Sequence, residues 1–475
     1  MLMLVVSSLI GLVLCYLFGN TWTFLNRSSH QGMYSARLTR AYLGASNSAR
    51  HRPGEQATDS ISDVMLGDDI EQRRYWPAID EAPYKKGAPL HLVNVTINET
   101  VSGKSQIEQR DRKGLAMALG PAALSAGVTS HLLFRGGSEA NRYDYDKVKV
   151  LPSSGSAFER SANGGKMVAE RLPLGQWTGI SGAAFSTGLG ARTSLGISLL
   201  AGFFNVRLGY WWKAVPDTGA PEPTPTPARR RCFSSLRDGF ISVFPVHAML
   251  MGELLSRFHG TAKRTWYLSD GGHFENLAGY ELIRRRIPLI VLIDAEEDQE
   301  YNFDGLANLV RKARLDFGAE IRFLSQTELD KVVEPTLRPW FGTLDQLRRG
   351  TWIEEPVPEP IGGRNRLSMS TVNLDQLSLA HAALAKVYYQ DSEVDSPPST
   401  LLYIKPTLTG DEPTDVRRYH IEHPDFPHES TAKQFFDEAQ WESYRRLGVH
   451  ISSKLFAEVE ASSDWFSPNA MRPLP

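Results

Sequence analysis

This sequence has few cysteines and almost no net charge. Only two cysteines occur in 475 residues, Cys15 in an apolar segment and Cys232 beside a run of arginines. Two thiols so placed supply neither a disulfide framework nor a cysteine metal site, and they favour a reducing compartment. The formal net charge is -2, so bulk charge recruits no nucleic acid. With 41% hydrophobic residues, the chain has enough apolar surface to bury a large core.

Motifs for bound cofactors are also missing. Neither a G-x-x-x-x-G-K-[ST] phosphate loop nor an H-E-x-x-H metal motif occurs. His420, His423 and His428 lie close in sequence, but two prolines between them favour a solvated loop over a metal site. The acidic stretch 294–298 offers calcium ligands, yet it lacks EF-hand spacing and is better explained as an acidic loop before a helix. We therefore predict no cofactor and no metal.

The chain opens on an uncharged apolar segment. Residues 1–19 carry no charged side chain and reach about the length of 20 residues that a bilayer requires. A signal peptide would need a basic first region and a small-residue cleavage site, and neither precedes Asn20. We predict a retained transmembrane helix over residues 1–20. Arg27, Arg37, Arg40 and Arg50 follow with no acid before Glu55, and this excess of positive charge predicts that the body faces the cytoplasm.

The remainder divides where the composition changes. Residues 21–90 form a polar juxtamembrane segment in which Met33 to Leu43 has a helical pattern. Alternating apolar side chains from Leu92 to Asn98 predict the first strand of an α/β domain over residues 91–475. A proline-rich stretch at 215–231 predicts an exposed insertion that divides this domain without ending it.

An apolar stretch lies just before that insertion. Leu195 to Trp212 has one charged residue, Arg207. Such a stretch is most often a core helix, but it also fits a lid whose aromatic side chains reach the membrane interface. Both interpretations stay open at the level of the sequence.

The most informative motif is Tyr-Leu-Ser-Asp-Gly-Gly-His-Phe-Glu-Asn-Leu at 267–277. Thr265 to Leu268 predicts a strand, and the apolar side chains after the glycines have helical spacing. A second apolar run, Leu289 to Ile293, predicts a buried parallel strand. Asp270 would then lie at the carboxyl end of a strand, where open α/β sheets bind ligands, and Gly271 and Gly272 would allow a close backbone approach. An amphipathic helix from Phe303 to Phe317 and a strand from Ile321 to Leu324 continue the pattern.

A serine among small residues provides a candidate nucleophile. Ser181 follows a weakly predicted strand, Pro173 to Trp177, and is flanked by Gly179 and Gly182. Glycines relieve crowding at the strained turn of a nucleophile elbow, and a carboxylate such as Asp270 activates the hydroxyl as a base. Four-residue matches of this kind also arise by chance, so Ser181 is equally well explained as a small residue at a close packing contact.

These motifs carry a resemblance. The DGG followed by ENL, the segment GISGAAFS, and YIKPTLTGDE at 403–412 resemble the bacterial patatin-like phospholipases and, more remotely, the group IV cytosolic phospholipases. The resemblance implies a three-layer α/β/α fold with a mostly parallel sheet, and a Ser-Asp dyad that hydrolyses esters of phospholipids or other acyl lipids. It assigns Asp270 as the base. His273 and Glu275 flank the DGG turn, with Asn276 next in sequence, and we expect these residues to orient Asp270 or to line the entrance for substrate. It also implies the bacterial inner membrane.

Two departures from that family keep an alternative open. The family has a glycine-rich oxyanion loop before its nucleophile, and here only Gly136-Gly137 and Gly164-Gly165 are available. The segment around Ser181 also resembles a later serine block of the family. The expected function is therefore a membrane-anchored lipid acyl hydrolase of phospholipase or lysophospholipase type. The alternative is the C-terminal portion of a split or truncated enzyme, a non-catalytic lipid-binding module whose nucleophile and oxyanion loop come from an upstream chain.

Overall fold

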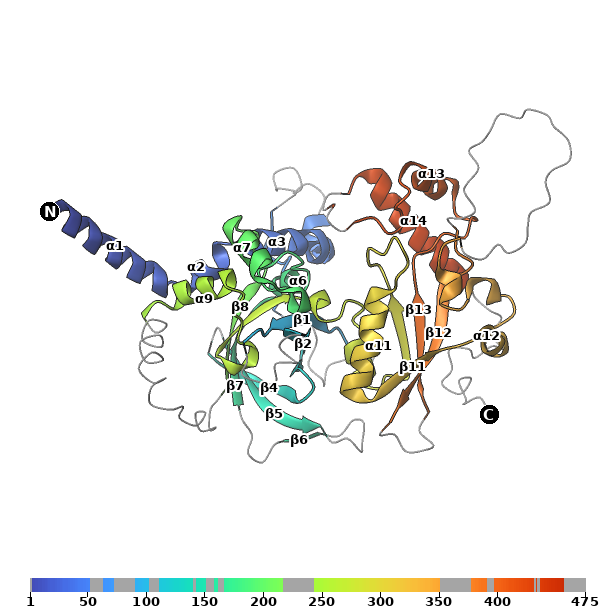
Figure 1. Ribbon diagram of the computed structural model, residues 1–475, viewed down its shortest axis with the longest axis horizontal. Coiled ribbons are helices and arrows are strands. Elements are labelled where there is room, and N and C mark those ends of the chain that lie inside the picture. Colours follow the sequence, from blue (N-terminus) through green and yellow to red (C-terminus); the bar gives the residue numbers. More distant parts are fainter. Residues whose placement is uncertain are drawn as a thin grey trace. The chain divides into compact units, whose positions relative to one another are not determined.

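The structure is a computed structural model in which the chain forms two compact units, residues 1–274 and 275–475 (Figure 1). The structure describes residues 2–51, 63–71, 90–101, 111–139, 142–150, 158–160, 166–216, 243–350, 377–390, 397–430, 433 and 436–456. Most of the predicted proline-rich insertion, residues 217–231, lies outside these ranges, as do Cys232 and Gly164-Gly165.

The first unit begins with helices. Helix α1 (Leu2–Asn20) is long and apolar enough to cross a membrane, as the sequence predicts, although a signal sequence has the same properties. Helix α2 (Trp22–Arg27) follows, and α3 (Gln31–Leu38) runs into a π-helical turn, η1 (Thr39–Leu43). The helical pattern predicted from Met33 to Leu43 is therefore confirmed. Two short 3-10 turns, η2 (Gly44–Ser46) and η3 (Ser48–His51), end this segment.

The body of the first unit is a closed barrel of eight antiparallel strands. They run in the order β4-β3-β2-β1-β9-β8-β7-β5, and β5 pairs back onto β4. A short strand, β6, pairs with the last residues of β5, after the part of β5 that pairs with β7. The bounds are β1 Val93–Asn98, β2 Gly114–Leu119, β3 Ala123–Ala126, β4 Ser130–Glu139, β5 Arg142–Val150, β6 Phe158–Arg160, β7 Lys166–Glu170, β8 Tyr210–Pro216 and β9 Thr265–Asp270. The predicted three-layer α/β/α fold with a mostly parallel sheet is wrong.

The barrel core explains why the chain closes in this way. Val93, Val95 and Ile97 of β1 are buried in one cluster with apolar residues from the neighbouring strands. Helix α6 (Leu174–Ser181) contributes Trp177, whose ring lies 5.4 Å from that of Trp212. Aromatic pairs with edge contacts add stabilisation beyond their buried area. Packing of α6 against this core therefore positions its last residue, Ser181.

Two further helices complete the first unit. Helix α7 (Leu195–Phe203) follows the 3-10 turn η5 (Gly190–Arg192). Helix α9 (Pro245–Leu254) precedes the turn η6 (Gly260–Ala262), which leads into β9. The stretch from Leu195 to Trp212 is thus a helix followed by the start of β8.

The second unit contains a four-stranded mixed sheet with the order β10-β13-β12-β11. Only the β10–β13 pair is parallel. The strands are β10 Leu289–Ile293, β11 Ala319–Phe323, β12 Ala382–Tyr389 and β13 Ser399–Ile404. The helices are α10 Tyr280–Arg284, α11 Asp304–Phe317, α12 Gln326–Val332, α13 Thr414–Glu422 and α14 Glu438–Leu455, with 3-10 turns η8 Arg338–Trp340 and η9 Asp345–Leu347.

The strands on either side of the DGG turn belong to different sheets. β9 pairs antiparallel with β1 and β8 in the barrel, whereas β10 pairs with β13 in the second unit. Asp270 ends β9 as predicted, but its cross-strand partner is Val95 of an antiparallel neighbour. The crevice of a parallel sheet, which the sequence pattern predicts around Asp270, is therefore not formed by β9.

Candidate active site

The DGG turn is built on a short helical cap. Asp270 is the N-cap residue of the 3-10 turn η7 (Gly271–His273), and its Oδ1 accepts a hydrogen bond of 2.7 Å from the Gly272 N–H. Aspartate is favoured at such positions because its side chain satisfies a backbone donor that the turn leaves free. The local sequence thus holds the carboxylate at the end of β9.

The first glycine of the motif is required by a close approach of β1. A Cβ atom at Gly271 would lie 2.6 Å from the carbonyl oxygen of Asn94. Thr96, two residues along β1, donates a hydrogen bond of 3.3 Å to the Gly271 carbonyl. Since any side chain at Gly271 would collide with backbone, only glycine keeps the turn against β1.

The environment of Asp270 suits a general base. Burial raises the pKa of its carboxyl to about 6, and the hydrogen bond from Gly272 opposes this change. Burial disfavours the charged form of an acid. A base works best when its pKa lies near the operating pH. At neutral pH Asp270 is therefore ionised and ready to accept a proton.

Ser181 lies at the end of a helix and not at an elbow between strand and helix. It is the last residue of α6, with Gly182 as the C-cap. A Cβ atom at Gly179 would lie 2.7 Å from the Ser35 Cβ, and one at Gly182 would lie 2.8 Å from the Tyr34 hydroxyl. These glycines let α3 pack closely on α6. The close-packing interpretation of this segment therefore has direct support.

Ser181 and Asp270 meet the same piece of β1. The Ser181 hydroxyl donates a hydrogen bond of 2.7 Å to the Asn94 carbonyl, and Asp270 pairs with the next residue, Val95. Among the hydrogen bonds of the described residues, Ser181 makes this one and none to the Asp270 carboxylate. The structure thus brings the two predicted residues into one neighbourhood without joining them directly.

Tyr34 of α3 also belongs to this neighbourhood. Its hydroxyl donates a hydrogen bond of 2.8 Å to the Gly182 carbonyl. Burial, and then the negative charge of Asp270, raise the pKa of the Tyr34 hydroxyl. No sequence pattern marks this tyrosine, because it stands in the polar juxtamembrane segment without any motif.

His273 is neutral and structural. Its Nε2 lies 3.1 Å from the Ala184 carbonyl, which only accepts, so Nε2 carries the proton. Its Nδ1 then accepts from the Ser269 hydroxyl at 2.8 Å, and Ser269 accepts from the Asn98 amide at 2.8 Å. Burial lowers the pKa of His273 to about 4. The imidazole joins the DGG turn to the segment after α6, in agreement with a supporting role.

Glu275 and Asn276 act within the second unit. The Glu275 carboxylate accepts backbone hydrogen bonds from Leu277 at 2.6 Å and Tyr280 at 3.1 Å, which caps the start of α10. Asn276 donates a hydrogen bond to Glu296. Their described contacts are those of a helix cap and the loop beside it.

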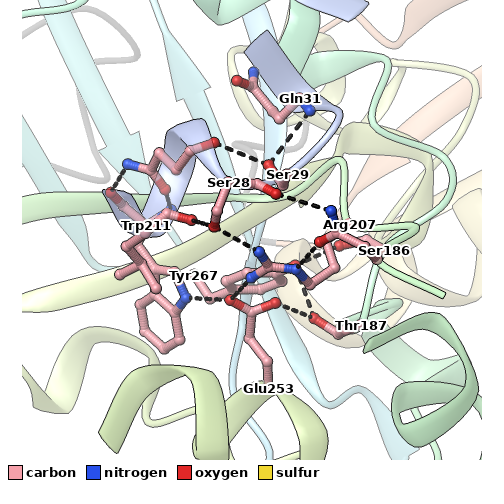
Figure 2. Close-up of polar contacts among 12 residues, drawn as sticks. Ser28, Ser29, Gln31, Ser186, Thr187, Arg207, Trp211, Glu253 and Tyr267 are labelled. Carbon is pink, nitrogen blue, oxygen red and sulfur yellow. Dashed lines mark hydrogen bonds and ion pairs between the residues drawn. The ribbon is translucent and has the colours of Figure 1, made fainter. Parts of the chain in front are cut away.

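A buried polar network reaches β9 at Tyr267, within the same strand that Asp270 ends. Glu253 of α9 accepts from Arg207 at 3.0 Å, from the Trp211 indole at 2.8 Å and from Thr187 at 3.0 Å (Figure 2). The Thr187 hydroxyl also lies within hydrogen-bonding distance, 2.8 Å, of the hydroxyl of Tyr267, three residues before Asp270. The network therefore joins α9, β8, β9 and the segment that follows Ser181.

The N-terminal helices are joined to the same network. Arg207 donates to the Ser28 hydroxyl at 2.9 Å, and Asn205 donates to the Ser28 carbonyl at 2.8 Å. Asn26 of α2 exchanges hydrogen bonds with the backbone of Trp211, at 3.0 and 2.9 Å. The segment directly after α1 is thus held on the barrel by the backbone of β8 and by side chains of the loop before it.

The sequence-derived metal candidates in the second unit have other partners. The ammonium group of Lys405 lies 3.1 Å from Asp294 and 3.0 Å from Asp298, so a lysine neutralises the acidic stretch. His420 and His428 bond to different backbone carbonyls, those of Phe426 and Glu296. His420 lies in helix α13, His428 lies in the loop after it, and both are buried, so the expectation of a solvated loop is wrong for these two residues.

A different group in the second unit has the spacing of metal ligands. Ligand atoms of His381, Asp411, Glu412 and His450 lie within 4.8 Å of one another. The ammonium group of Lys454 contacts Asp411, and the His450 Nε2 lies 3.1 Å from the same carboxylate. A divalent cation would have to displace that lysine. The residues span 381–450 in the sequence, so no short motif could reveal them.

The described residues contain no glycine-rich loop like the one that supplies oxyanion donors in the patatin-like family. Gly136 pairs with Asp144 within the β4–β5 ladder, so Gly136-Gly137 is part of a strand. No family model, no curated protein and no solved structure matches this chain. The likeness to patatin-like enzymes therefore rests on the three motifs quoted above.

Proposed function

We propose that the protein is a membrane-anchored hydrolase that cleaves carboxylic esters of lipids. The observation that carries the proposal is the placement of Asp270, a buried carboxylate with a raised pKa, beside the β1 backbone that also holds Ser181. Perturbed pKa values gather at functional sites more than elsewhere. The apolar helix α1 supports a lipid substrate and a retained anchor.

The proposed reaction proceeds through an acyl-enzyme. The Ser181 side chain first rotates away from the Asn94 carbonyl, and its Oγ attacks the ester carbon while the proton passes to Asp270. Asp270 then returns this proton to the departing alcohol. Water repeats both steps on the acyl-enzyme, releasing a carboxylic acid and restoring the hydroxyl. This use of one residue as base and then as acid is ordinary for covalent hydrolases.

The proposed location is the bacterial inner membrane, with the body facing the cytoplasm. Arginines 27, 37, 40 and 50 follow α1 before the first acid. Positive residues next to a membrane helix are retained on the cytoplasmic side.

A non-catalytic membrane module is the second candidate. The hydrogen bond from Ser181 to the Asn94 carbonyl favours it, because a hydroxyl engaged with backbone at the end of a helix is the usual state of a structural serine. In this case the unit would bind lipid without breaking it.

Labelling with a fluorophosphonate separates the two candidates. We expect the detergent-solubilised full chain to form an adduct on Ser181, located by peptide mass spectrometry. The adduct should disappear in Ser181→Ala and decline strongly in Asp270→Asn, because serine reacts slowly without a base. Melting temperatures of both variants check that they are folded.

The contrary results are distinct. A folded protein without an adduct on any serine would leave the non-catalytic module as the function. Labelling that is equal in the wild type and in Asp270→Asn would remove Asp270 from the mechanism. Ser186 and Ser269 serve as internal controls, since both are buried and their labelling would indicate unfolding.

A further inference from the structure

Helix α7 presents its apolar side to the outside. Phe203 is 82% exposed and Leu200 is 61% exposed. Four more side chains of this helix and the residues after it are exposed in the same way, namely Leu195, Ile197, Leu199 and Phe204. A surface helix of a soluble protein normally turns such residues toward the core.

The polar side of α7 is the side that faces the protein. Ser198 is fully buried; its hydroxyl donates to the Thr187 carbonyl at 2.6 Å and accepts from the Ser256 hydroxyl at 2.8 Å. The apolar side chains of α7 therefore face outward while its buried serine faces the protein, which is the reverse of a helix on a water-exposed surface. Such an arrangement is expected where the surroundings are apolar.

The exposed apolar surface continues onto α9. A Cβ atom at Gly202 of α7 would lie 2.4 Å from a methyl carbon of Leu254, so the two helices pack closely. Met251 of α9 and Leu255, the residue that follows this helix, are both about half exposed. α7 contains no charged residue, and the single one in α9, Glu253, is buried in the network of Figure 2. Neither helix thus offers an exposed charge to water.

The same surface is continuous with the candidate membrane span. The Asn20 amide at the end of α1 donates a hydrogen bond of 3.0 Å to the Val243 carbonyl, just before α9. A Cβ atom at Gly19 would lie 2.8 Å from the His247 ring of α9. α1 therefore meets α9, and α9 meets α7 (Figure 1).

We propose that the exposed sides of α7 and α9 lie in the boundary between head groups and acyl chains of the bilayer that α1 enters. We call this surface, formed by residues 195–204 and 243–255, the membrane-contact face. An interfacial helix buries its apolar side about 5–10 Å into that boundary. Continuity with α1 and the lack of exposed charge identify lipid as the occupant. The proposal concerns how the first unit meets the membrane, and it is independent of any reaction at Ser181.

Depth-dependent quenching tests the proposal on the full chain in nanodiscs of phosphatidylcholine and phosphatidylglycerol. With Cys15 and Cys232 changed to serine, a single cysteine replaces Phe203 and carries an environment-sensitive fluorophore. We expect spin-labelled lipid to remove most of its emission and aqueous iodide to have little effect. The matched control is Val128→Cys, because Val128 is an exposed apolar residue in the turn between β3 and β4. At this position we expect iodide to remove most of the emission and spin-labelled lipid to have little effect.

Two outcomes would overturn the proposal. If iodide quenched the label at position 203 as strongly as the label at position 128, α7 would face water. If neither quencher reached position 203, protein would cover the face, and a second copy would be the occupant. A melting temperature equal to that of the unlabelled protein verifies the fold of each labelled sample.

Discussion

Asp270→Asn is expected to stabilise the protein at neutral pH while it strongly slows hydrolysis. Burial raises the pKa of this carboxyl from 3.8 to about 6. A difference of one in pKa between the folded and unfolded states corresponds to about 1.4 kcal/mol, so the ionised side chain destabilises the folded state by roughly 2–3 kcal/mol at pH 7. Asparagine is an equally good N-cap residue and keeps an acceptor for the Gly272 N–H. It therefore removes the buried charge without removing the cap.

The pH dependence follows from the raised pKa of Asp270. The folded state holds the Asp270 proton more tightly than the unfolded chain. This contribution to stability is thus largest below the unfolded pKa of about 4, declines between about pH 4 and 6, and is lost above that range. Urea unfolding from pH 4 to 8 should show the decline in the wild type relative to Asp270→Asn. Esterase activity should instead rise as pH passes through about 6, because the base must be ionised, and it should fall about a hundredfold or more in the variant.

The same substitution at Asp68 is the matched control. Hydrogen bonding to Arg50 holds the pKa of Asp68 well below its usual range. An acid with a depressed pKa stabilises the fold above its unfolded pKa and loses this contribution as pH falls. Asp68→Asn should therefore destabilise the protein at pH 7. A loss of stability at both positions would mean that Asp270 is a structural carboxylate, and it would no longer be a candidate base.

Individual elements could be predicted from the sequence because their signals are local. The alternation at Leu92 to Asn98 is β1, the run from Leu289 to Ile293 is β10, and the amphipathic segment from Phe303 to Phe317 is α11. Side-chain periodicity reports which faces are buried, and each of these segments has a buried side. The same periodicity does not report which strands are neighbours. β9 is buried and β10 is buried on one face only; the two strands are close in sequence, and they belong to different sheets.

The environment of Ser181 shows a second limit. Pro173 to Trp177 is predicted as a weak strand, and the glycines in and after this segment have a low intrinsic preference for a helix. In the structure the segment is α6, and a Cβ atom would collide with Thr39 of η1 at Gly175 and with Ser35 of α3 at Gly179. The close contact between two helices outweighs the intrinsic preference of glycine. Such a contact involves residues about 140 positions apart in sequence, so no local pattern contains it.

The apolar stretch from Leu195 to Trp212 shows a third limit. Composition alone left a core helix and an interfacial lid as alternatives. The structure divides the stretch into an exposed helix, α7, and a barrel strand, β8, whose Trp212 is buried. Arg207, the one charge in the stretch, lies between them and enters the buried network. A single apolar run thus contains a helix that is exposed at the surface and the start of a strand that is buried in the barrel.

Arg207→Met is expected to cause the largest loss of stability among the substitutions considered. Glu253 is fully buried, and burial raises the pKa of its carboxyl, an effect that the charge of Arg207 opposes. Removing one partner of a buried ion pair leaves an uncompensated charge and destabilises by about 3–5 kcal/mol. The loss should become smaller as the pH falls, because Glu253 takes up a proton more readily once the arginine is gone.

A double-mutant cycle separates the ion pair from simple packing. Combining Arg207→Met with Glu253→Gln should recover part of the loss, because neither charge then remains buried alone. The matched control is Arg37→Met on the exposed side of α3, where we expect a change within about 0.5 kcal/mol. Urea unfolding followed by tryptophan fluorescence measures the free energy of unfolding of each variant, and the Trp211 indole, which donates to Glu253, is one of the ten tryptophans that contribute to the signal. Strictly additive losses in the cycle would mean that the two side chains stabilise the fold independently. In that case the network would not be what holds α2 and α9 on the barrel.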